Sequence, residues 1–161
     1  MSLQQTAGLP AIVALHRYSM HANRMRQHFE AALKQNPSKP RQLSPKPNIT
    51  EIAAVMTDAV RYSADDRGMF MSYWYGTLYV VIEGWKQLRL SDPRLDKLIK
   101  SPNVGRLKLY RNGVYHFQRN YFDDRFAGFM KSKDSVAWVR EVHSEFGRFF
   151  LEAYARRQAE K

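Results

Sequence analysis

Residues 69–88 read MFMSYWYGTLYVVIEGWKQL, the most apolar stretch of this 161-residue chain. Large apolar side chains recur in it every three or four residues, which is the spacing of one face of an α-helix. These residues are Phe70, Trp74, Leu78, Val81, Trp85 and Leu88. The uninterrupted apolar part of this stretch, residues 69–82, is too short to cross a bilayer, which takes roughly 20 apolar residues, and Glu83 ends it. It therefore predicts a helix at the centre of a soluble fold.

Tyr75, Tyr79 and Glu83 follow at four-residue steps on the opposite side of this predicted helix. An outer face so rich in tyrosine is expected to be covered, either by another helix or by a second subunit. Gly76 and Gly84 weaken an isolated helix. We interpret them as places where a neighbouring helix comes close.

Further segments with helical spacing flank this one, and proline, glycine and polar residues separate them. They span about residues 10–35, 50–63, 93–100, 102–121 and 135–157. We find no β-hairpin pattern and no internal repeat. The sequence predicts an all-α fold, an up-and-down bundle of four main helices plus one or two short helices. A chain of this length fits a single domain, residues 1–161, with a proline- and lysine-rich loop at 36–49.

Several details of these helices can be predicted. Thr50 is expected to cap the second helix. The inward face of this helix should comprise Ile52, Val55, Met56, Ala59 and Val60. The inward face of the helix after Pro102 should comprise Leu107, Tyr110, Val114, Phe117 and Tyr121. His143 is expected on the polar side of the last helix.

The charge balance favours an anionic partner. Lys and Arg total 26 against 15 Asp and Glu, a net charge of +11. Such a surplus suits nucleic acid first and an anionic membrane surface second, although a basic surface can also simply be solvated. The chain has no cysteine, which excludes disulfides and thiolate chemistry. Because the first residues lack a signal-peptide pattern and the most apolar stretch is too short to span a bilayer, we expect a cytoplasmic protein without a membrane partner. His21 and His28 are seven residues apart without nearby carboxylates, so we expect no metal, and we expect no cofactor.

Residues 111–116, RNGVYH, carry the chemistry of this sequence. Arginine supplies a fixed positive charge, asparagine an orienting amide, and histidine a group that exchanges protons near neutral pH. On a continuous helix, Asn112 and His116 would lie together on the outward face, with Arg111 at the edge of the inward one. Two copies of the helix facing one another could join the arginine of one chain to the histidine of the other.

This motif resembles that of HEPN-domain proteins, α-helical bundles whose ribonuclease members carry R-N-x-x-x-H. The match is confined to RNGVYHF at 111–117, while the helical architecture covers most of the chain. The resemblance implies a metal-independent endoribonuclease, a toxin or phage-defence protein, with Arg111, Asn112 and His116 as catalytic residues. It also implies a homodimer, an antitoxin protein as a partner, and an acidic residue on another helix that orients the site, for which Glu83 is our candidate.

Other residues are candidates for RNA contact. Arg119 and Tyr115 lie next to His116 in the sequence. Arg17 and Arg24 belong to a stripe with His21 and His28 on the first helix, which either follows phosphates or is a solvated face. The alternative to catalysis is a bundle that only binds RNA or a nucleotide, or that serves as a protein-interaction module with an acidic partner.

Overall fold

The computed structural model describes residues 8–35, 44–46, 48–64, 66–117, 119 and 124–159. Seven α-helices occur in this part of the chain, and it contains no strand, which confirms the all-α prediction. They are α1 (Leu9–Gln35), α2 (Ile49–Ala64), α3 (Asp66–Gln87), α4 (Pro93–Ile99), α5 (Asn103–Tyr115), α6 (Asp124–Met130) and α7 (Ser135–Ala159).

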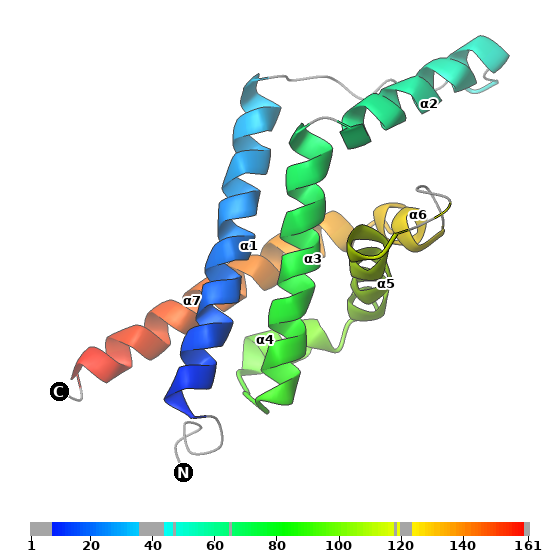
Figure 1. The fold of residues 1–161 in the computed structure, drawn as a ribbon. Helices are drawn as coiled ribbons and strands as arrows, with labels where there is room; N and C mark the ends of the chain where they lie inside the picture. Colours follow the sequence, from blue (N-terminus) through cyan, green and yellow to red (C-terminus); the bar gives the residue numbers. More distant parts are fainter. Residues whose placement is uncertain are drawn as a thin grey trace.

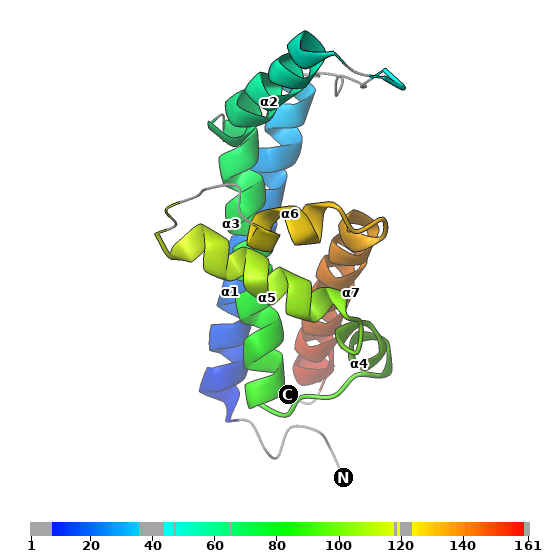
Figure 2. The same cartoon turned by 90° about the vertical axis from the view of Figure 1, so that its right-hand side faces the viewer.

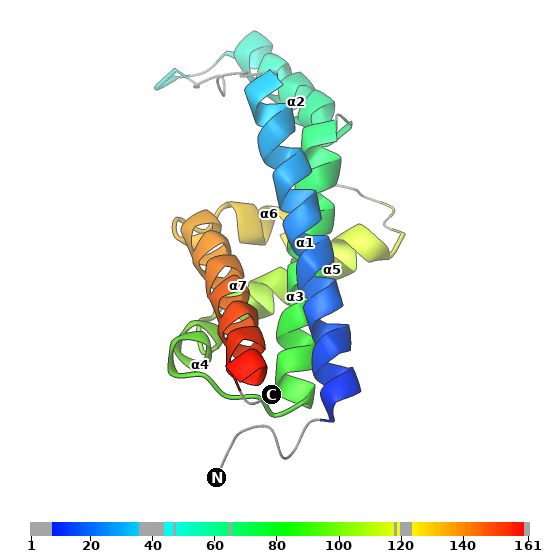
Figure 3. The same ribbon diagram turned by 90° about the vertical axis from the view of Figure 1, so that its left-hand side faces the viewer.

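Helix α3 lies at the centre of the molecule. Helices α1 and α3 run antiparallel side by side, as an up-and-down bundle requires, and α7 crosses them obliquely (Figure 1). Helix α5 instead crosses α3 almost at a right angle, as Figure 2 shows, and α6 follows it back across the bundle. In the opposite view, α1 lies in front of α3 and α5 lies behind it (Figure 3). Helix α3 therefore separates α1 from α5.

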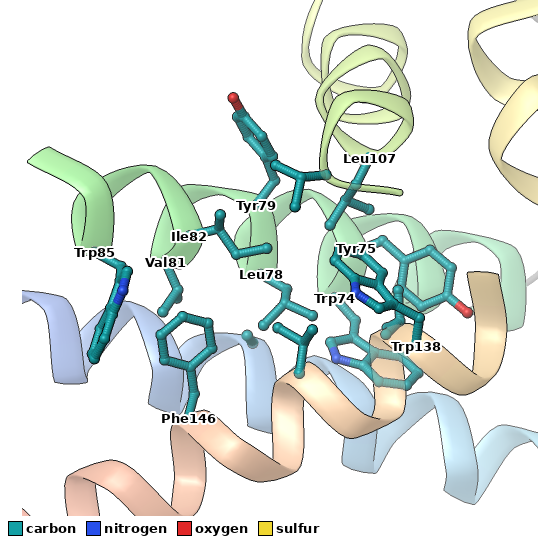
Figure 4. Close-up of a cluster of buried hydrophobic side chains, with 14 of the residues drawn as sticks. Trp74, Tyr75, Leu78, Tyr79, Val81, Ile82, Trp85, Leu107, Trp138 and Phe146 are labelled. Carbon is teal, nitrogen blue, oxygen red and sulfur yellow. The ribbon is translucent and has the colours of Figure 1, made fainter. Parts of the chain in front are cut away.

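The core is built on α3, as the apolar spacing predicted. Trp74, Leu78, Val81 and Trp85 are almost completely buried. Figure 4 shows these side chains packed against Phe146 and Trp138 of α7 and Leu107 of α5. The Trp85 ring lies edge-on to the ring of Phe146, with 5.6 Å between the ring centroids. Because these side chains are large and rigid, their burial supplies most of the apolar contact that stabilises the fold.

Two of the three glycines of α3, Gly76 and Gly84, are contact points, as predicted. A Cβ atom built on Gly84 would lie 2.6 Å from the Leu15 Cδ1 atom of α1. A Cβ atom on Gly76 would lie 2.6 Å from the Tyr115 Cε2 atom of α5. Each glycine therefore removes a side chain that would push a neighbouring helix away from α3.

The tyrosine-rich face of α3 is covered by the same chain, not by a second subunit. Tyr75 is buried, and its ring contacts the rings of Tyr110 in α5 and Phe129 in α6. The Ser72 and Tyr110 hydroxyls lie 3.0 Å apart and form a buried hydrogen bond at the same crossing. Helix α5 therefore covers the tyrosine-rich face of α3, for which the sequence had left two possibilities, another helix or a second subunit.

Helix α2 departs from the prediction. Asn48, not Thr50, caps it: the Asn48 Oδ1 atom accepts a hydrogen bond of 2.9 Å from the Glu51 backbone N–H. Ile52 and Met56 were expected to be buried, yet both are exposed, Met56 by 66%. Figure 1 shows α2 pointing away from the other helices, which agrees with the exposure of these two residues. The predicted loop before it lies largely outside the described residues.

Candidate functional site

The motif lies at the C-terminal end of α5. Arg111 and Asn112 are in its last turn, and the helix ends at Tyr115. His116 is the C-terminal cap, with extended backbone angles of φ −118° and ψ 137°, and its N–H donates to the Asn112 carbonyl oxygen. The His116 side chain is exposed. The prediction of a continuous helix through His116 to about residue 121 is therefore wrong, because α5 ends at Tyr115.

The early end of α5 also changes the position of Phe117. This residue was expected on the inward face, but its side chain is 91% exposed. Tyr115, His116 and Phe117 are consecutive aromatic residues with modest helix propensity, so little holds the helix together beyond this point. Leu107 and Tyr110, nearer the start of α5, are fully buried as predicted. Tyr121, the last residue of the predicted face, lies outside the described residues.

Arg111 is held at the crossing of α3 and α5. Its Nη1 atom donates a hydrogen bond of 3.1 Å to the Asn112 Oδ1 atom. Its guanidinium carbon lies 5.9 Å from the centre of the Tyr115 ring, within the range of a cation–π contact. The buried Nε atom has no hydrogen-bond partner within the described part of the chain. The motif asparagine therefore orients the arginine next to it.

Tyr115 rests on α3. The close approach at Gly76 brings the Tyr115 ring onto the backbone of α3. Its hydroxyl lies 3.3 Å from the Thr77 Oγ1 atom, a long hydrogen bond. The centroid of its ring is 6.1 Å from that of Tyr73. The predicted RNA-contact residue Tyr115 thus joins an aromatic surface whose other member, Tyr73, was not singled out from the sequence.

Glu83 and Arg111 act on the same tyrosine. Burial raises the pKa of Tyr79, the nearby Glu83 carboxylate raises it further, and the Arg111 guanidinium lowers it. Figure 4 shows Tyr79 projecting from α3 away from α7. No ion pair joins Glu83 to Arg111 in the described residues. The candidate acid therefore lies in the same region as the motif arginine and is linked to it through Tyr79.

The other predicted RNA-contact residues separate into two places. Arg119 is exposed in the bend that follows α5, three residues beyond His116. Arg17 and Arg24 are exposed on α1, each two positions after a buried residue, Leu15 and Ala22 respectively. Two positions on a helix correspond to about 200°, so these arginines face away from α3. Since α5 lies beyond α3, the stripe on α1 is not part of the motif surface.

His143 is not simply on the polar side of α7, as the sequence suggested, but half-buried between α1, α3 and α7. Its Nδ1 atom accepts a hydrogen bond of 3.1 Å from the Trp74 indole N–H. Its Nε2 atom lies 3.2 Å from the Asn23 Oδ1 atom, to which it donates once Nδ1 is the acceptor. Burial lowers the pKa of His143 to about 4, the Arg26 guanidinium lowers it as well, and Glu30 opposes them. The residue is a neutral structural link between α1, α3 and α7.

Comparisons of the chain with protein-family models, with curated proteins and with solved structures found no match. None of the described helices combines the length and the apolar character needed to span a bilayer. The described residues also contain no group of three or more His, Asp or Glu side chains placed to hold a metal ion.

Proposed function

We propose that this protein is a metal-independent endoribonuclease of the HEPN type, with Arg111 and His116 as its catalytic residues. The observation that carries the proposal is the placement of R-N-x-x-x-H at the end of α5, where His116 is exposed and Arg111 is oriented by Asn112. A proton-transfer group accessible to solvent thus lies five residues along the chain from a fixed positive charge, at the same end of α5. Cleavage of a phosphodiester uses both a proton-transfer group and a positive charge that offsets the charge on the phosphate.

The chemistry uses the 2′-hydroxyl of RNA. One histidine accepts the proton of the 2′-hydroxyl as the oxygen attacks phosphorus, and the P–O5′ bond breaks. The leaving 5′ oxygen takes a proton from a second histidine, so the products are a 2′,3′-cyclic phosphate and a free 5′-hydroxyl. Arg111 offsets the negative charge that grows on the phosphate oxygens. Asn112 acts indirectly, by positioning the Arg111 guanidinium.

A homodimer through α5 would supply the second histidine. Gly105, Leu109 and Asn112 follow at spacings of four and three residues, which places them on one stripe of α5, and His116 caps the end of the helix next to this stripe. Leu109 is an exposed apolar residue, and a Cβ atom on Gly105 would contact nothing within 4 Å. Such a stripe permits close approach of a second copy. Sedimentation of wild type and of Leu109→Glu protein tests this, since the charge should shift a dimer to monomer.

The central experiment is cleavage of a labelled single-stranded RNA by purified protein. Because general acid–base catalysis contributes typically 10²–10⁴-fold, His116→Ala should reduce the rate by at least about 100-fold. His21→Ala, which alters an exposed histidine of α1, is the matched control and should retain the wild-type rate. Cleavage should survive excess EDTA, and DNA of the same sequence should remain intact. Full activity of pure His116→Ala protein would contradict the assignment.

The toxin or phage-defence role, with an antitoxin partner, follows from the resemblance alone. Expression of the wild-type chain should arrest growth, and expression of His116→Ala protein should not. Equal growth with both proteins would remove the toxin role, while cleavage in vitro would still decide the chemistry.

A second candidate is an RNA-binding bundle without catalysis. The observation in its favour is that Arg111 also has a packing role, since its guanidinium lies against Tyr115 and its Nε atom is buried. Phosphate contacts should then give an affinity that falls steeply with salt, without any cleavage product. Affinity insensitive to salt would favour a protein partner.

A further inference from the structure

Two tyrosines expose their rings side by side where α5 crosses α3. Tyr73 is 42% exposed and Tyr115 is 45% exposed. Their ring centroids are 6.1 Å apart and their planes are inclined by 46°. Large aromatic rings usually lie deeper, as Trp74 and Tyr75 do in the same helix. Tyr73 and Tyr115 are called the tyrosine pair below.

The pair is held in place before any ligand binds. The missing side chain at Gly76 leaves room for the Tyr115 ring, and the Thr77 hydroxyl contacts the Tyr115 hydroxyl. Both residues that hold the ring belong to α3, which is anchored in the core. A ring fixed in this way loses little conformational entropy when a flat ligand stacks on it.

Positive charge and a further aromatic ring border the pair. The Arg111 guanidinium carbon lies 5.9 Å from the centre of the Tyr115 ring. His116 and Phe117 follow directly, and both side chains are exposed. Arg119 is exposed two residues later. Aromatic rings that accept bases, combined with cations that accept phosphates, are the chemistry by which proteins hold single-stranded nucleic acid.

We propose that the tyrosine pair is a base-stacking site for single-stranded RNA, next to the motif and on the same surface. The inference rests on the proposed function and specifies its substrate: an unpaired strand, with bases on Tyr73 and Tyr115 and a phosphate near Arg111. A duplex fits poorly, because its bases are already stacked inside the helix and only backbone and groove edges are exposed.

The test is fluorescence anisotropy with a labelled single-stranded 2′-O-methyl RNA, whose blocked 2′ oxygen prevents cleavage. Tyr73→Ala should weaken binding by about 5- to 150-fold, the range expected when stacking of one base is lost. Tyr73→Phe should keep the wild-type affinity, since it keeps the ring. Tyr18→Ala removes a tyrosine of similar exposure, 48%, from α1 and should have no effect. A duplex of the same sequence should bind more weakly than the single strand.

The outcomes separate this inference from the nuclease proposal. Tyr73→Ala protein that binds as tightly as wild type, or a duplex that binds as tightly as the single strand, would overturn the stacking site even if His116 proves essential for cleavage. Conversely, loss of binding in Tyr73→Ala protein together with absence of cleavage by wild type would keep the stacking site and remove the nuclease. Circular dichroism of each variant ensures that a loss of affinity is not a loss of fold.

Discussion

Protonation of His143 should by itself lower the free energy of unfolding by a measurable amount as the pH falls. In the unfolded chain its pKa is about 6.5, whereas in the native state burial and Arg26 lower the pKa to about 4. Above pH 6.5 the residue is neutral in both states, so its contribution is fully present. Between pH 6.5 and 4 only the unfolded chain takes up the proton, and native stability falls. Since one pKa unit corresponds to about 1.4 kcal/mol, the loss should approach about 3 kcal/mol.

Urea unfolding at several pH values between 7 and 4 measures this loss. Other histidines and carboxyl groups titrate in the same range, so the comparison needs His143→Gln, whose amide can accept from Trp74 and donate to Asn23 without titrating. The free energy of unfolding of the wild type should fall by about 3 kcal/mol more than that of the variant. His21→Gln, altered on the exposed side of α1, should follow the wild type. Parallel pH profiles for wild type and His143→Gln would contradict the buried hydrogen-bonded position.

Two further predictions concern α3 and its neighbours. Glu83→Gln should lower the pKa of Tyr79 and Arg111→Ala should raise it, because the two charges act on this hydroxyl with opposite signs. NMR titration of ring-labelled tyrosine measures the pKa of Tyr79 in each variant. Shifts of the same sign in the two variants would refute the placement of Glu83 and Arg111 near this hydroxyl. Gly84→Ala should destabilise the protein by about 1–3 kcal/mol, since the new methyl group collides with α1. Gly147→Ala in α7 meets open space and should instead stabilise by about 0.5–1 kcal/mol. Thermal unfolding of both glycine variants checks the difference, and equal effects would show that the close α1–α3 contact is absent.

Some parts of the site followed from residue type and spacing. The periodicity of α3 predicted its buried face, and Gly76 and Gly84 were correctly interpreted as places of close approach. The identity of the neighbours was not predictable, because Gly76 says only that some group comes near. Tyr73 was missed for the same reason, because its ring gains a partner only where the packing of α5 on α3 places Tyr115 next to it.

His143 shows the limit most clearly. Its hydrogen-bond partners lie 69 and 120 residues away in the sequence, at Trp74 and Asn23. Helix α2 shows the opposite case: its apolar spacing is sound, but the rest of the chain leaves residues such as Met56 uncovered. A pattern of side chains can state which face is apolar, but it cannot state what will cover that face.

The sequence alone determines where the helices lie: apolar residues three and four apart mark them, and prolines and glycines separate them. The composite features depend on the packed molecule. The hydrogen bonds of His143 to Trp74 and Asn23, and the placement of Arg111 near Tyr79, require contacts between helices. The spacing of apolar residues along the chain marks which of them share one face of a helix, whereas a site is assembled by side chains that only the packing of the core brings within reach of one another.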